Sequence, residues 1–144
     1  MVTEAQAAAF VLDNSISLSW CLGDESEDYP ARVLLALRTT RARVPSLWPY
    51  EVANGLAVSE RRNRLTPAGL QRALADLAAL PIEVDPASHE RGMGEVLALA
   101  RQERLTAYDA AYLELAMREG LPIATLDQEI LHAAARLGVA RFEP

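Results

Sequence analysis

Short apolar runs alternate with longer stretches of helical periodicity along this chain, and that alternation restricts the possible folds more than any other feature. The run Ala9–Leu12 has the character of a short buried strand, whereas Val33, Leu34 and Leu37 recur at the spacing of a helix face. The expected order is strand, helix, helix, strand, helix, helix, strand, helix, helix, strand, helix, strand, with strands at 10–13, 42–44, 82–84, 122–125 and 139–142. Strands that alternate with helices form a parallel sheet covered on both faces, so we expect an α/β fold.

Several helix ends are marked by residues with known structural preferences. Thr66-Pro67 pairs an N-cap with proline at the first helical position, and Thr106 is the expected cap of a later helix. Gly120 suits the left-handed residue that follows that helix, while Ser46 is the expected cap of the helix that carries Glu51. The predicted buried faces are Leu70, Leu74, Leu77 and Leu80 after Thr66, and Val96, Leu97, Leu99 and Ala100 in a helix over 88–103.

The totals fit one domain over residues 1–144, in which residues 1–8 form a flexible N-terminal extension. A chain of this length buries roughly two-thirds of its unfolded surface. Its first residues lack the basic region and apolar core of a signal peptide, and no apolar run approaches the roughly 18 residues of a membrane span. Because Cys21 is the single cysteine, no internal disulfide can form, and we expect a cytoplasmic protein.

Arginine supplies all 14 basic residues, and the absence of lysine excludes several classes of phosphate-handling protein. A P-loop needs a lysine on the β/γ phosphates, and phospho-receiver and phosphohydrolase domains use a lysine to neutralise the phosphoryl group. The net charge of −6 is unfavourable for a polyanionic substrate unless positive charge gathers locally. Two clusters, Arg38, Arg41 and Arg43, and Arg61, Arg62 and Arg64, would either contact phosphates or lie as solvated helix ends.

Four acidic residues stand at the junctions between these elements. Asp13 ends the first strand, and Asp127 follows the strand at 122–125. Glu51 opens an apolar-periodic stretch, and Asp109 lies in the first turn of the helix after Thr106. Each has a structural explanation as well, as a turn residue, an N-cap or an acid at the positive end of a helix. If the four converge, they form an acidic pocket that needs a divalent cation.

Four blocks carry a resemblance to a known family: Phe10-Val11-Leu12-Asp13-Asn14-Ser15, Pro49-Tyr50-Glu51-Val52-Ala53-Asn54, Tyr108-Asp109-Ala110-Ala111-Tyr112-Leu113-Glu114-Leu115-Ala116 and Ile123-Ala124-Thr125-Leu126-Asp127. In order and spacing they resemble the blocks of PIN domains, in particular those of VapC-type ribonuclease toxins of type II toxin–antitoxin systems. The likeness extends from Phe10 to Phe142. It implies a three-layer fold around a parallel sheet of strand order 3-2-1-4-5, with helices on both faces.

The resemblance also assigns roles to individual residues. Asp13 and Asp109 would be the principal ligands of Mg²⁺ or Mn²⁺, with Glu51 completing the site directly or through a water. Asp127 would support a metal ion or the attacking water, and all four acids would be catalytic. Ser15 and Thr125 match accessory hydroxyl positions. Glu129 lies where many relatives place a further acid, but it is Glu rather than Asp and is left out of the expected site.

The resemblance implies an endoribonuclease that hydrolyses RNA phosphodiester bonds as the toxin of a toxin–antitoxin pair. The expected partners are an RNA substrate, a cognate VapB-like antitoxin that inserts an arginine or a helix into the acidic pocket, and a second copy in a homodimer. Apolar segments around Trp48, Leu56 and Leu70 would serve such an interface or pack in the core.

Two other readings stay open. A metal-independent ribonuclease would use His89 and His132, the only histidines, yet both fall in helical segments outside the matched blocks. A non-cleaving PIN-like module would bind RNA or protein without cutting it, although such a module has no need of four acids. Survival of activity in EDTA would favour the histidines, and metal binding without cleavage would favour the module.

Overall fold

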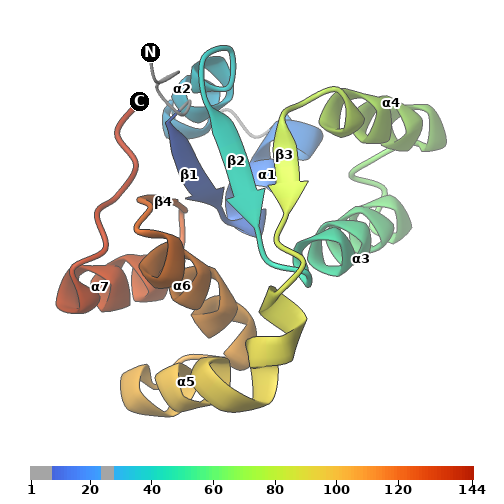
Figure 1. Cartoon of the computed structure of the whole chain (residues 1–144). Helices are drawn as coiled ribbons and strands as arrows, with labels where there is room; N and C mark the ends of the chain where they lie inside the picture. The colour runs from blue at the N-terminus through green and yellow to red at the C-terminus, as the bar shows by residue number, and fades with distance from the viewer. Residues whose placement is uncertain (1–7, 24–27) are drawn as a thin grey trace.

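The computed structural model describes residues 8–23 and 28–144, so most of the predicted extension 1–8 lies outside the described residues. The described strands are β1 (Ala9–Leu12), β2 (Arg41–Val44), β3 (Ile82–Val84) and β4 (Ile123–Ala124). They form a parallel sheet in the order β3-β2-β1-β4, and the arrows of β1, β2 and β3 run in one direction in Figure 1. The predicted α/β fold and the order of its first four strands are confirmed.

The predicted fifth strand at 139–142 is wrong as a full strand, although its place beside β4 is right. In the described chain it is reduced to one parallel bridge between Arg141 and Ile123. The Ile123 N–H donates to the Ala140 carbonyl at 3.0 Å, and the Phe142 N–H donates to the Ile123 carbonyl at 2.8 Å. Because β4 has only two residues, it offers little edge for a further ladder.

Helices connect the strands in the predicted order. They are α1 (Asn14–Leu22), α2 (Tyr29–Ala36), α3 (Trp48–Arg61), α4 (Pro67–Ala78), α5 (Leu97–Glu103), α6 (Ala107–Glu119) and α7 (Gln128–Leu137). The predicted ends at Thr66, Thr106 and Gly120 are confirmed, because both threonines accept a backbone N–H and Gly120 is left-handed. None of the helices in the described ranges is long and apolar enough to cross a membrane.

Side chains that alternate along β1 divide the core between two faces of the sheet. Val11 packs with α5, α6 and α7, whereas Phe10 and Leu12 pack with α1, α2 and the end of the chain. Figure 1 shows α1 and α2 behind the sheet and α5, α6 and α7 grouped apart from them. A third apolar cluster joins α3 and α4 to α1. The three layers therefore follow from the two-residue period of β1.

Some local predictions are wrong. Ser46 does not cap α3, which begins at Trp48 after Leu47 without a side-chain cap; the Ser46 N–H instead donates to the Ser88 hydroxyl at 2.6 Å. Pro49 in the first turn has no N–H, which leaves one donor fewer for a cap to satisfy. The single helix over 88–103 is a 3₁₀ turn (η1, Ser88–Arg91), a π-helical turn (η2, Gly92–Val96) and α5.

Two of the predicted core leucines are exposed. Leu97 stands at the start of α5 with 47% of its surface accessible, and Leu74 on α4 is 45% accessible. The leucine spacing predicts that Leu74 is buried, but the smaller Ala73 beside it is buried instead. Helix α4 packs against α3 and part of α1 through Ala73, Leu70 and Leu77, which leaves Leu74 on its exposed side. Leu56, for which the sequence allowed either an interface or core packing, is buried in the core.

A network of ion pairs fastens α6 to the sheet. Arg118 contacts Asp85 at 2.5 Å and Glu114 at 2.9 Å, and both of these acids are buried. Arg43 of β2 contacts Glu119 at 2.6 Å and also reaches Asp85 at 3.7 Å, while Arg91 pairs with Glu114. Two buried carboxylates thus depend on guanidinium groups from three different elements.

Replacing Arg118 tests this network. Arg118→Met would leave Asp85 and Glu114 short of a counter-charge, a change that costs about 3–5 kcal/mol in buried pairs. Because Arg43 and Arg91 keep their contacts, we expect the unfolding free energy to fall by about 3 kcal/mol, at the lower end of that range. Chemical denaturation measures the unfolding free energy. Arg72→Met, which breaks only an exposed pair with Asp76, is the control; equal losses in both variants would contradict the role of the network.

Candidate functional site

The carboxyl ends of β1 and β4 bring the first and last predicted acids together. These strands are neighbours at the point where the strand order reverses, which is where open α/β sheets bind ligands. Asp13 follows β1 and N-caps α1, and it is buried. Asp127 follows β4 and N-caps α7, where its Oδ1 accepts the N–H of Glu129 at 2.8 Å and of Ile130 at 3.1 Å. Their capping roles are therefore real, and they place both carboxylates at one edge.

The other two acids reach the same edge from the first turns of helices. Glu51 lies in the first turn of α3, directly after β2, and Asp109 lies in the first turn of α6. All four predicted acids thus stand at helix N-termini. The positive end of each helix dipole partly offsets the negative charge there.

The four acids are close enough for their charges to act on one another. The pKa of Asp109 is raised to about 6, first by burial and then by the charges of Asp127, Asp13, Glu51 and Glu129. Burial raises the pKa of Asp13 as well, with Asp127 adding to the shift. It also raises the pKa of Glu51, where Asp13 contributes. The site therefore accumulates negative charge that a bound cation would offset.

Three carboxylates are close enough to share an ion. Oxygens of Asp109, Asp127 and Glu129 lie within 4.8 Å of one another. Asp13 and Glu51 are not part of this tightest group, although both act on Asp109 through their charge. Carboxylate oxygens are the ligands that Mg²⁺ and Mn²⁺ prefer, so the donor set fits the predicted ion. Glu129, which the sequence analysis left out, lies inside the group because its backbone follows the Asp127 cap.

Two hydroxyl groups hold the Asp13 carboxylate. The Ser15 and Thr125 hydroxyls both donate to its Oδ2, at 2.6 and 2.8 Å. The Ser15 oxygen accepts the Leu126 N–H at 3.0 Å, and the Thr125 oxygen accepts the Asp127 N–H at 3.0 Å. These bonds tie the end of β1 to the segment after β4. The two predicted accessory residues are therefore adjacent to the acids, and they orient Asp13.

A tyrosine that the sequence analysis did not select also contacts the site. Tyr112 lies on α6 one turn after Asp109 and is buried, and its hydroxyl donates to Glu51 Oε1 at 2.6 Å. Burial, together with this hydrogen bond, raises the pKa of Tyr112, so it stays a neutral donor. Its place in the Tyr-Asp-Ala-Ala-Tyr block was visible in the sequence, but an apolar helix face explained it equally well.

Some arginines of the two predicted clusters are engaged away from the four acids. Arg41 and Arg43 are engaged in ion pairs with Glu83, which removes them as free phosphate contacts. Arg61 ends α3, at the opposite end from Glu51. His89 in η1 and His132 in α7 are both exposed, and neither appears among the groups that act on the acids.

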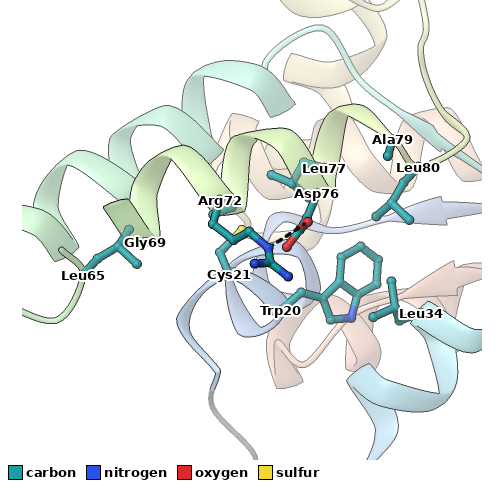
Figure 2. Close-up of a pocket in the computed structure, with 11 residues that line it drawn as sticks. Trp20, Cys21, Leu34, Leu65, Gly69, Arg72, Asp76, Leu77, Ala79 and Leu80 are labelled. Carbon is teal, nitrogen blue, oxygen red and sulfur yellow. Dashed lines mark ion pairs between the residues drawn. The ribbon is translucent and has the colours of Figure 1, made fainter. Parts of the chain in front are cut away.

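A second candidate site is an apolar pocket of about 490 Å³ between α1, α2 and α4. Figure 2 shows Trp20 and Cys21 of α1, Leu34 of α2 and Leu77 of α4 around it. The ion pair between Arg72 and Asp76 lies at its rim, with 3.5 Å between Nε and Oδ1. Because α1 carries Asp13 at its start and Trp20 near its end, one helix connects the acidic site with this pocket.

The crowding of carboxylates predicts a pH-dependent stability of the metal-free protein. Since the pKa of Asp109 rises from 3.8 to about 6 on folding, this group favours the folded state fully below about pH 4 and loses that contribution as the pH rises through 6. In EDTA, we expect the melting temperature of the wild type to fall more steeply between about pH 4 and pH 7 than that of Asp109→Asn. Asp28→Asn, at an exposed position, should keep the wild-type slope. Parallel slopes for wild type and Asp109→Asn would contradict the assignment.

Known proteins resemble this chain in sequence and in structure. Ribonuclease VapC3 of Mycobacterium tuberculosis, in strains CDC 1551 / Oshkosh and H37Rv, is 30% identical over 110 residues, which cover 75% of this chain and 76% of the relative. The crystal structure of PAE2754 from Pyrobaculum aerophilum superposes with a TM-score of 0.62 at 27% identity, over 92% of this chain and 83% of that one.

The crystal structure of VapBC2 from Rickettsia felis, bound to a DNA fragment from their promoter, gives a TM-score of 0.64 over 94% of this chain and 97% of that one. Its 16% identity makes it evidence for the fold alone. The sequence model of the PIN domain family matches residues 10–136, which include all four predicted acids. The chain therefore belongs to the PIN domain family and is of the VapC type.

Proposed function

We propose that this protein is a metal-dependent endoribonuclease and the toxin of a toxin–antitoxin pair. The observation that supports this most is the gathering of Asp13, Glu51, Asp109 and Asp127 at the switch point of a parallel sheet. The family and the similarity to a ribonuclease of the VapC type agree with that site. Mg²⁺ or Mn²⁺ is the proposed cofactor, and RNA the proposed substrate.

The chemistry of phosphodiester hydrolysis explains why such a site would be used. A water oxygen forms a bond to phosphorus, one P–O bond breaks, and the leaving oxygen takes up a proton. A divalent ion, when bound, lowers the pKa of water and stabilises the added negative charge. Asp109, Asp127 and Glu129 would hold the ion, and Asp13 and Glu51 would offer further oxygen donors.

The remaining residues orient these acids. Ser15 and Thr125 fix the Asp13 carboxylate through their hydrogen bonds, so that its position does not depend on solvent. The caps that Asp13 and Asp127 make hold their backbones in place, because each carboxylate is bound to the N–H groups of its own helix. A site placed on strand ends and helix N-termini is rigid before substrate arrives, which supports catalysis by positioning.

The apolar pocket in Figure 2 supports the proposal of an antitoxin partner. Leu34 is 39% exposed there, and the partly buried Leu77 of α4 adds to the apolar lining. We assign this pocket to apolar side chains of the cognate antitoxin. A chain that lies on it can follow α1 toward Asp13 and bring a basic residue to the acidic site, where the charges are complementary.

Homodimer formation and a cytoplasmic location are also parts of this proposal. Light scattering during gel filtration measures the mass of the purified protein and separates a dimer from a monomer.

Substitution of the acids tests the nuclease proposal. Asp13→Asn and Asp109→Asn each keep the side-chain shape but remove a negative charge from the site. Loss of a ligand should reduce RNA cleavage by about 100-fold or more, since even partners of ligands are worth 10–100-fold. Asp28→Asn is the exposed control. Cleavage is measured on single-stranded RNA with Mg²⁺ or Mn²⁺, and circular dichroism verifies the fold.

The same assay separates the alternatives. EDTA should stop cleavage, and added Mn²⁺ should restore it. Activity that persists in EDTA would support the histidine mechanism. Mn²⁺ binding without cleavage by the wild type would support a non-cleaving module instead.

Two neighbouring leucines of α2 test the antitoxin pocket. Leu34 lines the pocket, whereas Leu35 is 58% exposed and does not. Leu34→Glu should weaken binding of the protein encoded beside this gene by about tenfold or more, as expected for the loss of a central apolar contact. Leu35→Glu should bind like the wild type, and both variants should still cleave RNA. Calorimetry measures the affinities; equal binding by both variants would place the antitoxin elsewhere.

A further inference from the structure

The contact between Tyr112 and Glu51 joins the two halves of the acidic site. Glu51 comes from α3, whose buried residues Val52 and Leu56 pack with α4 and α1, whereas Tyr112 comes from α6, which packs with α5 and α7. The two residues are 61 positions apart in the sequence, and the hydroxyl-to-carboxylate distance is 2.6 Å. Through this hydrogen bond, a side chain of another element holds Glu51.

Tyr112 is fully buried, whereas Glu51 is only half-buried. Tyr112 is among the largest fully buried side chains and packs in the cluster of α5, α6 and α7. Glu51 is half-buried on the first turn of α3. A glutamate has three rotatable side-chain bonds, and fixing them costs entropy when a ligand binds. A buried donor that fixes one oxygen removes much of that cost beforehand.

The spacing on α6 makes this arrangement part of the metal site. Asp109 and Tyr112 are three residues apart, so both project from one side of the helix. Asp109 joins the tight carboxylate group directly, and Tyr112 reaches the carboxylate that comes from across the site. One face of α6 therefore positions two acids. Asp109 is part of the helix itself, and Glu51 is held by the hydrogen bond from Tyr112.

We propose that Tyr112 is a positioning residue that holds Glu51 Oε1 and leaves Oε2 as the oxygen for the divalent ion. This inference rests on the proposed metal-dependent function. A carboxylate bound by a phenol at one oxygen acts as a single-oxygen donor with a defined direction. Without the phenol, Glu51 would turn toward solvent, and the ion would lose a preorganised ligand.

Removal of one oxygen atom tests the proposal. Tyr112→Phe keeps the buried ring and removes the donor, so the protein should unfold at nearly the wild-type temperature. Loss of a partner that orients a ligand should weaken Mn²⁺ binding by about tenfold. RNA cleavage at limiting Mn²⁺ should fall, and saturating Mn²⁺ should recover most of it. Tyr50→Phe and Tyr108→Phe are the controls, since these tyrosines precede Glu51 and Asp109 but are 79% and 64% exposed.

A double-mutant cycle identifies the mechanism. If Tyr112 acts through Glu51, Tyr112→Phe should change Mn²⁺ affinity much less in a Glu51→Gln background than in the wild type. Equal effects in both backgrounds, or wild-type Mn²⁺ affinity in Tyr112→Phe, would overturn the positioning role while leaving the nuclease proposal intact. A wild type that neither binds Mn²⁺ nor cleaves RNA would overturn both. Calorimetric titration with Mn²⁺ alone provides the affinities.

Discussion

The mutual repulsion of carboxylates gathered at one edge of the sheet is the constraint on which the rest of this structure depends. Burial and neighbouring charge together raise the pKa of Asp109 to about 6, so the folded chain bears a cost for keeping these groups close. Part of that cost is offset locally, because the acids stand at helix N-termini and accept hydrogen bonds from backbone and hydroxyl groups. A bound cation would offset more of it.

The fold supports this edge from both sides. On one face, α6 is fastened to the sheet by Arg118 and Arg43, whose ion pairs neutralise buried acids away from the acidic site. On the other, α1 starts at Asp13 and continues to the apolar pocket at Trp20. The distinction between the two acidic regions is physical: carboxylates beside the Arg118 network have cations from the chain, whereas those at the switch point repel one another. Among the described residues, no ion pair with an arginine is made by the four acids of the second region.

Much of the candidate site could be predicted from the sequence, because each acid has a local marker. Asp13 and Asp127 directly follow apolar strands, and Asp109 follows Thr106 at capping distance. The relation between Glu51 and Tyr112 could not be predicted in this way, because it joins residues 61 positions apart. Glu129 was set aside on its residue type, yet the turn made by the Asp127 cap brings it within 4.8 Å of the other acids. Contact across the fold, rather than residue type, decided both cases.

The sequence by itself determined the order of strands and helices, the parallel sheet and the helix ends at Thr66, Thr106 and Gly120, because periodicity and capping act over a few residues. The tertiary structure alone decided that the last segment makes one bridge at Arg141 instead of a strand, since the available edge of β4 is two residues long. It also decided which leucines stay uncovered, as burial depends on what packs opposite a helix and not on the spacing within it. The tertiary structure also decided that the acids converge, because the four carboxylates are far apart in the sequence and only the folded sheet brings them together.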